Sequence, residues 1–174
     1  MSLVYPSSEI KKELQRLSSP EITALCLRLV RFKKENKELL TYLLFKADDE
    51  DAFIKEFKEE MDLQFGKLKG KSYLVVKGLR KIALDMNNQI RYTGSEVVKT
   101  ELLLHFCTNY INYIDYRSHY KPLRNVFYRF VEKTKDAIGK LHEDLQYDYG
   151  NLYLEMLTNA EEKIYWFEKK LLML

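Results

Sequence analysis

Hydrophobic and polar residues recur with helical spacing along almost the whole chain. Apolar residues return every three or four positions in 8–17, 18–32, 72–91 and two long segments after Pro122. This spacing places them on one face of an α-helix. No segment has the pattern of a credible β-strand. The sequence therefore predicts an all-α protein of six or seven helices.

Segment 93–116 has a different pattern, with apolar or aromatic residues around most of the helix circumference. A helix that is apolar nearly all round is usually buried, so we expect this segment to form the centre of the fold. Thr93 and Glu96 have the spacing of a capping box, which predicts that the helix begins there.

Other signals mark where further helices begin and end. Ser18 and Glu21 also have capping-box spacing. The acidic run 48–51 suits the N-terminus of a helix, where the macrodipole favours negative charge. Near the C-terminus, 147–151 contains Gly150 and reads as a turn between two heptad-like helices. Such helices predict a long antiparallel hairpin over 120–174.

Two parts of the chain are similar to each other. Residues 30–32 followed by 37–43 share a pattern with 90–92 followed by 100–106. This predicts an internal repeat with copies at 18–66 and 78–142. Stacked α-hairpins of this kind resemble HEAT and armadillo proteins in architecture. The alternative to a true repeat is a chance likeness between leucine-rich helices. The alternative to stacked hairpins is an irregular helical bundle.

Composition narrows the class of protein. The chain has 174 residues, enough for a single domain over 1–174 with a real core, and few glycines or prolines. Cys26 and Cys107 lie among apolar neighbours, which fits two buried thiols in a reducing compartment. No segment reaches 18 apolar residues. We therefore expect a soluble, cytoplasmic protein that does not enter a membrane.

Charge alternates by block along the chain. Residues 48–62 hold eight acidic and two basic groups, and 143–168 hold seven acidic groups and one lysine. Residues 67–92 hold seven basic groups and one aspartate, and 117–135 hold six basic groups and one glutamate. Neighbouring helices of opposite charge could pair at their flanks, at little gain in stability. Alternatively, the basic blocks form one surface for phosphates.

Aromatic residues are interleaved with the second basic block, as in proteins that bind single-stranded nucleic acid. Tyrosines at the edge of a helical core explain the same pattern, because thirteen tyrosines are spread through the chain. The residues with which we expect this surface to bind a partner are Lys77, Arg80, Lys81, Arg91, Tyr116, Arg117, His119, Tyr120, Lys121 and Arg124.

Catalytic and metal-binding patterns are weak. Glu101 with His105, and Asp115 with His119, are spaced four apart, as in ordinary helix-surface pairs. These residues, with His142, are the candidates for a metal site. Cys107 lies two residues from His105, so the two point to different sides of a helix. We assign no catalytic residue, no metal ligand and no cofactor.

The leading hypothesis is a non-enzymatic helical protein-interaction module, a scaffold or adaptor that binds a protein partner. The last helix could also support a homodimer if its outer side is apolar. The first alternative is a nucleic-acid-binding protein that uses the basic, tyrosine-rich surface. The second alternative is a helical metalloprotein.

Overall fold

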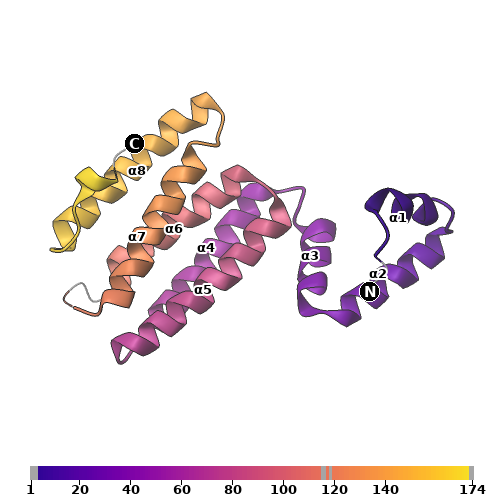
Figure 1. Cartoon of the computed structure of the whole chain (residues 1–174), viewed down its shortest axis with the longest axis horizontal. Helices are drawn as coiled ribbons and strands as arrows, with labels where there is room; N and C mark the ends of the chain where they lie inside the picture. Colours follow the sequence, from indigo (N-terminus) through magenta and orange to yellow (C-terminus); the bar gives the residue numbers. More distant parts are fainter. Residues whose placement is uncertain (1–3, 115–116, 118, 173–174) are drawn as a thin grey trace. The chain divides into compact units, whose positions relative to one another are not determined.

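The computed structural model describes residues 4–114, 117 and 119–172, and these ranges form eight α-helices, one short 3₁₀-helix and no β-strand (Figure 1). The all-α prediction is confirmed, with more helices than the six or seven expected. Within the described ranges, no helix combines the length and apolarity needed to cross a lipid bilayer. The chain divides into two compact units, Met1–Phe45 and Lys46–Leu174. The repeat stays a prediction.

The N-terminal unit contains α1 (Ser7–Leu14), α2 (Ser19–Phe32) and α3 (Lys34–Phe45). The predicted capping box is confirmed at the start of α2, where the backbone N–H and the hydroxyl of Ser18 both donate to the Glu21 carboxylate. These hydrogen bonds lower the pKa of Glu21. Helix α2 packs against α3, while α1 ends earlier than the expected helix over 8–17.

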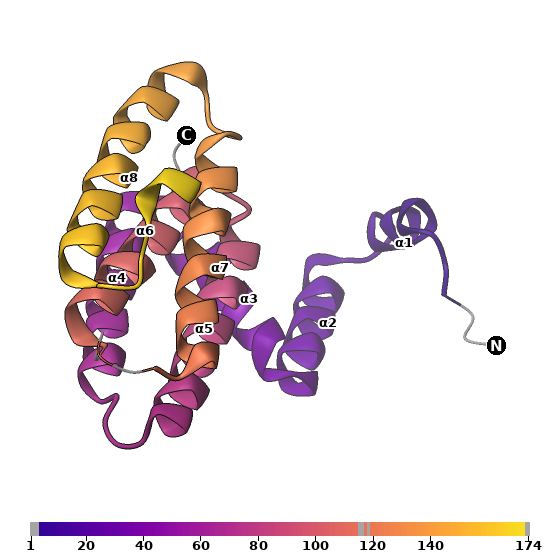
Figure 2. The same ribbon diagram turned by 60° about the vertical axis from the view of Figure 1, so that its left-hand side comes forward.

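The C-terminal unit is an up-and-down arrangement of five helices. Figures 1 and 2 show them side by side, with consecutive helices running in opposite directions. The central one, α6, contacts each of the other four, and around it α4 contacts α5, α5 contacts α7, and α7 contacts α8. The five helices are α4 (Glu50–Gly66), α5 (Ser72–Thr93), α6 (Glu96–Tyr113), α7 (Lys121–Ile138) and α8 (Glu143–Lys163).

Helix α6 covers 96–113 of the segment that was predicted to be central, and it lies at the centre of the C-terminal unit. Ten of its residues are buried, and they include Val98, Leu102 and Phe106. The Phe106 ring lies 4.2 Å from the ring of Phe130 on α7, measured between centroids. Because α6 meets a helix on nearly every side, its apolar residues can occupy most of the circumference and still be covered.

The predicted start of α6 at Thr93 is wrong. Thr93 is the last residue of α5, and Gly94 ends that helix with φ +66, a left-handed conformation that suits glycine. The cap of α6 is Ser95, whose hydroxyl oxygen accepts from the Val98 N–H at 3.4 Å. The glycine therefore lies between the two helices, and the cap of α6 is two residues later than predicted.

The predicted C-terminal hairpin is present with its turn in a different place. The turn occupies 139–142, and Gly150 is buried within α8. The last helix ends at Lys163 instead of continuing to the end of the chain. Beyond it, the 3₁₀-helix η1 (Lys169–Leu171) contacts α8. The Tyr153 hydroxyl donates to the Leu172 carbonyl at 2.9 Å, which ties this segment to α8.

Candidate functional site

The N-terminal unit has almost no core. No residue of α1 or α2 is buried, and Tyr42 is the buried residue of α3. Large apolar side chains that the core of a bundle would cover are instead exposed. In this unit they are Val4, Tyr5, Ile10, Leu14, Ile22, Leu25, Leu27, Leu29, Phe32, Leu43, Leu44 and Phe45.

Four of these exposed residues form a stripe along α2. Ile22, Leu25, Leu29 and Phe32 are spaced by three, four and three residues, so they share one helix face. We call this stripe the α2 seam. Its exposed fraction rises from 39% at Ile22 to 73% at Phe32. The sequence predicted this stripe, but the N-terminal unit does not supply the helix that would cover it.

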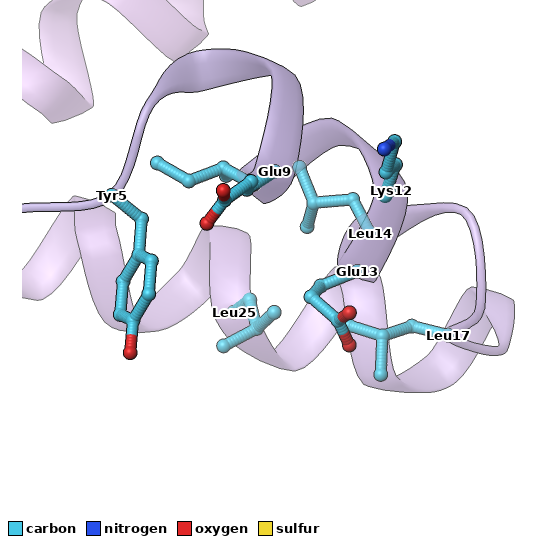
Figure 3. A pocket seen from close by; sticks show the side chains of 8 residues that line it. Tyr5, Glu9, Lys12, Glu13, Leu14, Leu17 and Leu25 are labelled. Carbon is cyan, nitrogen blue, oxygen red and sulfur yellow. The ribbon is translucent and has the colours of Figure 1, made fainter.

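An apolar pocket lies between α1 and α2, within the N-terminal unit, with a volume of about 550 Å³. Figure 3 shows Tyr5, Leu14, Leu17 and Leu25 around it. Leu25 belongs to both the pocket and the α2 seam, so the two features are continuous. Ile10 completes the apolar lining, and the charged lining residues are Glu9, Lys12 and Glu13.

The energetics of this unit favour occupation of the pocket. A helix of eight residues such as α1 is too short to be stable on its own in water. Covering a large apolar side chain contributes roughly 1.5–3 kcal/mol. An apolar side chain from another helix would gain this burial at the pocket and at the α2 seam.

The basic residues predicted on α5 are all exposed: Lys77, Arg80, Lys81 and Arg91. Among the described residues, none of these four has a carboxylate within ion-pair distance. Helix α5 contacts α7, so the two basic blocks lie on neighbouring helices. No ion pair between described residues joins α5 to the acidic helix α4. These four cations therefore belong to solvent-facing surface.

The basic residues predicted before and within α7 have a different environment. The exposed residues of this group are Arg117, His119, Tyr120 and Lys121. Tyr116 lies outside the described residues. Arg124 is only partly exposed.

Arg124 anchors the C-terminal segment to α7. Its guanidinium donates to the Tyr165 hydroxyl at 2.9 Å and lies 5.1 Å from the Trp166 ring centroid. The Nδ1 atom of His119 lies within hydrogen-bond distance of both Arg124 and Tyr165. Arg124 and His119 therefore hold the C-terminal segment against α7, and their role in binding a partner stays a prediction.

Glu101 and His105, which looked like metal or catalytic residues, bind α4 to α6. The Asp62 carboxylate on α4 accepts from the Asn109 amide at 2.7 Å and lies 2.6 Å from the Nε2 atom of His105. Lys58 and Tyr149 both donate to Glu101, the Tyr149 bond measuring 2.6 Å. The sequence could not indicate these partners, which lie 43 to 48 residues away along the chain.

This network changes the titration of its members. Burial, the largest influence on Glu101, would raise its pKa. The hydrogen bonds from Lys58 and Tyr149, together with the lysine charge, outweigh burial and hold that pKa below its ordinary value. Burial and the Glu101 carboxylate raise the pKa of Tyr149. At neutral pH the arrangement is therefore a carboxylate that receives two hydrogen bonds, which fastens α8 and α4 to α6.

The three histidines have different partners. His105 pairs with Asp62, His119 with Arg124 and Tyr165, and His142 lies 3.4 Å from the Asp144 carboxylate. Over the described part of the chain, no group of three or more His, Cys, Asp or Glu side chains is placed to hold a metal ion. The predicted partner of His119, Asp115, lies outside the described residues.

No protein-family model, curated protein or solved structure matches this chain. Function is therefore inferred from the residues themselves.

The feature that sequence patterning did not reveal is the pocket, because a stripe of apolar residues looks the same whether or not a partner helix covers it. The sequence signal that could have indicated the pocket was the shortness of the first predicted helix.

Proposed function

We propose that this protein is a non-enzymatic helical interaction module whose N-terminal unit binds an amphipathic helix of a partner protein. The observation that carries this proposal is the apolar pocket of about 550 Å³ that continues into the exposed α2 seam. In this proposal the C-terminal unit is the stable body that carries the binding unit.

The shape of the apolar surface favours a helix as the occupant. The α2 seam spans eleven residues, and its ends are roughly 15 Å apart at the rise of an α-helix. Its spacing of three and four residues matches the anchors of helix-in-groove recognition. A surface patterned in this way pairs with a second helix by interdigitating side chains. The pocket would then receive one large anchor side chain near Leu25.

The charges around the pocket favour a partner helix that is basic on one flank. Two of the lining residues, Glu9 and Glu13, are acidic, and Lys12 is basic. Glu13 already pairs with Arg16 at 2.8 Å. Glu9 therefore remains to meet a lysine or arginine of the partner, which would add orientation more than affinity.

The nucleic-acid alternative has less support. Single-strand binding uses aromatic rings that are free to stack on bases. Tyr113 and Tyr120 are exposed beside the second basic block, whereas Tyr110 and Tyr153 are buried and their hydroxyls donate to the carbonyls of Leu123 and Leu172. Tyr165 and Trp166 pack against Arg124.

Binding of a defined peptide to the full chain tests the proposal. The probe is an 18-residue alanine-based helical peptide with leucine at the spacing of the α2 seam and lysine on one flank, labelled for fluorescence anisotropy. We expect saturable binding that Leu25→Asp weakens at least tenfold, because the aspartate places a charge where pocket and seam meet.

Leu84→Asp is the matched control, since Leu84 is exposed on α5 of the C-terminal unit. This variant should bind the peptide like the unchanged chain. Equal affinity of Leu25→Asp and Leu84→Asp would contradict the proposal. If sedimentation analysis shows a dimer that Leu25→Asp dissociates, the occupant of the pocket is a second copy of this chain and not a helix of another protein. Turnover of a metabolite by the pure protein would oppose a non-enzymatic role.

A further inference from the structure

A second depression, separate from the N-terminal pocket, lies where α5, α6 and α7 meet in the C-terminal unit. Its volume is about 200 Å³. Ile90 of α5 and Leu103 of α6 contribute apolar lining, and three lysines contribute positive charge: Lys99, Lys133 and Lys140. These lysines come from the first turn of α6, from α7 and from the turn after α7.

The cations around this depression outnumber the carboxylates. Arg129 and Lys133 both lie against the buried ring of Phe130, at 5.4 and 5.2 Å from its centroid. Asp136 is the acidic residue among the described lining residues, and Glu96 pairs with Lys99 at 2.7 Å. Among the lining residues, three lysines therefore face one carboxylate, and Arg129 lies beside Lys133 just outside the lining.

The titration of Lys133 agrees with this excess of positive charge. Burial, and then the charges of Arg129 and Lys99, lower its pKa. An anion among these cations would relieve their repulsion. The positive surface also continues along α5, where Arg80 and Arg91 lie seven and four residues from the lining residue Asn87. Those spacings place all three on one helix face.

We propose that this depression binds a phosphate group, using Lys99, Lys133 and Lys140 as charged donors and the Asn87 amide as a neutral donor. The volume is several times the roughly 30 Å³ that a water molecule occupies. It is smaller than the pockets of about 300–1,000 Å³ that enclose whole cofactors. A single multivalent oxyanion matches both the size and the number of cations. Lysine commonly acts as a point charge for phosphate.

The phosphate could belong to a free polyphosphate or to a nucleic-acid backbone, and two titrations distinguish these sources. Sodium pyrophosphate and a 12-nucleotide single-stranded DNA are each titrated into the full chain in low-salt buffer by calorimetry. We expect binding of at least one probe, weakened by added salt because the contacts are ionic. The Lys133→Gln variant should lower the affinity about tenfold, since hydrogen bonds to charged groups contribute roughly 1.5–3 kcal/mol.

Lys55→Gln is the control, because Lys55 is an exposed lysine of α4 outside this depression. Lys140→Gln provides a second variant at an exposed position that should fold normally. Pyrophosphate binding that depends on Lys133 and Lys140 supports the site with a free anion as its source. DNA binding alone with the same dependence supports the site with a backbone phosphate. Binding of neither probe, or equal loss in Lys55→Gln, overturns the proposal.

Discussion

The two units of this protein are built from similar amphipathic helices but use their apolar residues differently. In the C-terminal unit, α6 alone buries ten residues. In the N-terminal unit, α1 and α2 together bury none. The difference lies in the number of neighbours, because α6 contacts four helices and α2 packs against α3. An amphipathic pattern therefore specifies which face of a helix is apolar, but not what covers that face.

Truncating a core phenylalanine should produce the largest effect. We expect Phe106→Ala to lower the free energy of unfolding by about 3–5 kcal/mol, the usual cost of a cavity in place of a buried phenylalanine. Phe106 is 0% exposed and packs between the rings of Phe65 and Phe130. Urea denaturation followed by circular dichroism measures the change. A loss below about 1 kcal/mol would mean that α6 is not the centre of the stable unit.

The polar network between α4, α6 and α8 should contribute the next largest effect. Glu101→Gln removes the charge that Lys58 and Tyr149 bind, so we expect a loss of about 1–3 kcal/mol at pH 7. The same denaturation measurement applies. Glu59→Gln, an exposed change on α4, is the control and should have little effect.

The contribution of this network should depend on pH in a defined direction. The pKa of Glu101 is lower in the folded than in the unfolded state, so its stabilisation is present above its ordinary pKa of 4.5 and is lost as pH falls. The pKa of Tyr149 is raised by folding, so its contribution is present below its ordinary pKa of 10 and is lost as pH rises. The difference between the unchanged chain and Glu101→Gln should therefore shrink below pH 4.5. A constant difference from pH 3 to 7 would oppose this assignment.

Removing one helix cap in each unit compares the stability of the two units more directly. Ser95→Ala removes the acceptor for the Val98 N–H, and we expect it to lower the unfolding free energy of the C-terminal unit by about 1 kcal/mol. Ser18→Ala removes the cap of α2. It should reduce the helical signal and speed amide hydrogen exchange in α2 while leaving α6 protected. Equal loss of protection in α2 and α6 would show that the two units unfold together.

The smallest effect on stability should come from truncating an exposed phenylalanine in the N-terminal unit. Phe32 is 73% exposed, so Phe32→Ala should change the free energy of unfolding by less than about 0.5 kcal/mol. The proposed interaction predicts that this variant still weakens peptide binding, since Phe32 ends the α2 seam. Anisotropy and denaturation on one sample separate the two effects. A stability loss as large as that of Phe106→Ala would remove the contrast between the units.

The parts of the fold that follow from local chemistry were predictable from the sequence. The capping box at Ser18, the acidic start of α4 and the all-round apolar pattern of α6 each depend on residues close together in the chain. The turn at 139–142 was missed because the apolar spacing continues from Ile138 to Leu141 and Leu145. Gly150 was misleading because a glycine also fits inside a buried helix.

The candidate sites depend on longer-range contacts. The pairing of Asp62 with His105, and the meeting of Lys99 with Lys133, require the tertiary packing of helices that no local pattern specifies. The apolar pocket depends on a missing neighbour, which a sequence pattern also does not show. Apolar stripes and basic residues can therefore be identified from a sequence, but which of them stay exposed depends on tertiary packing.

The positions of the two cysteines give each unit its own chemical reporter. Cys107 is buried in α6, where its thiol lies 3.7 Å from the Thr134 hydroxyl and burial raises its pKa to about 12. Cys26 lies half-buried on α2. Because the thiolate is the reactive species, a maleimide should modify Cys26 in the folded protein and reach Cys107 only when the C-terminal unit opens. The rate of the second modification would then time that opening, without any engineered probe.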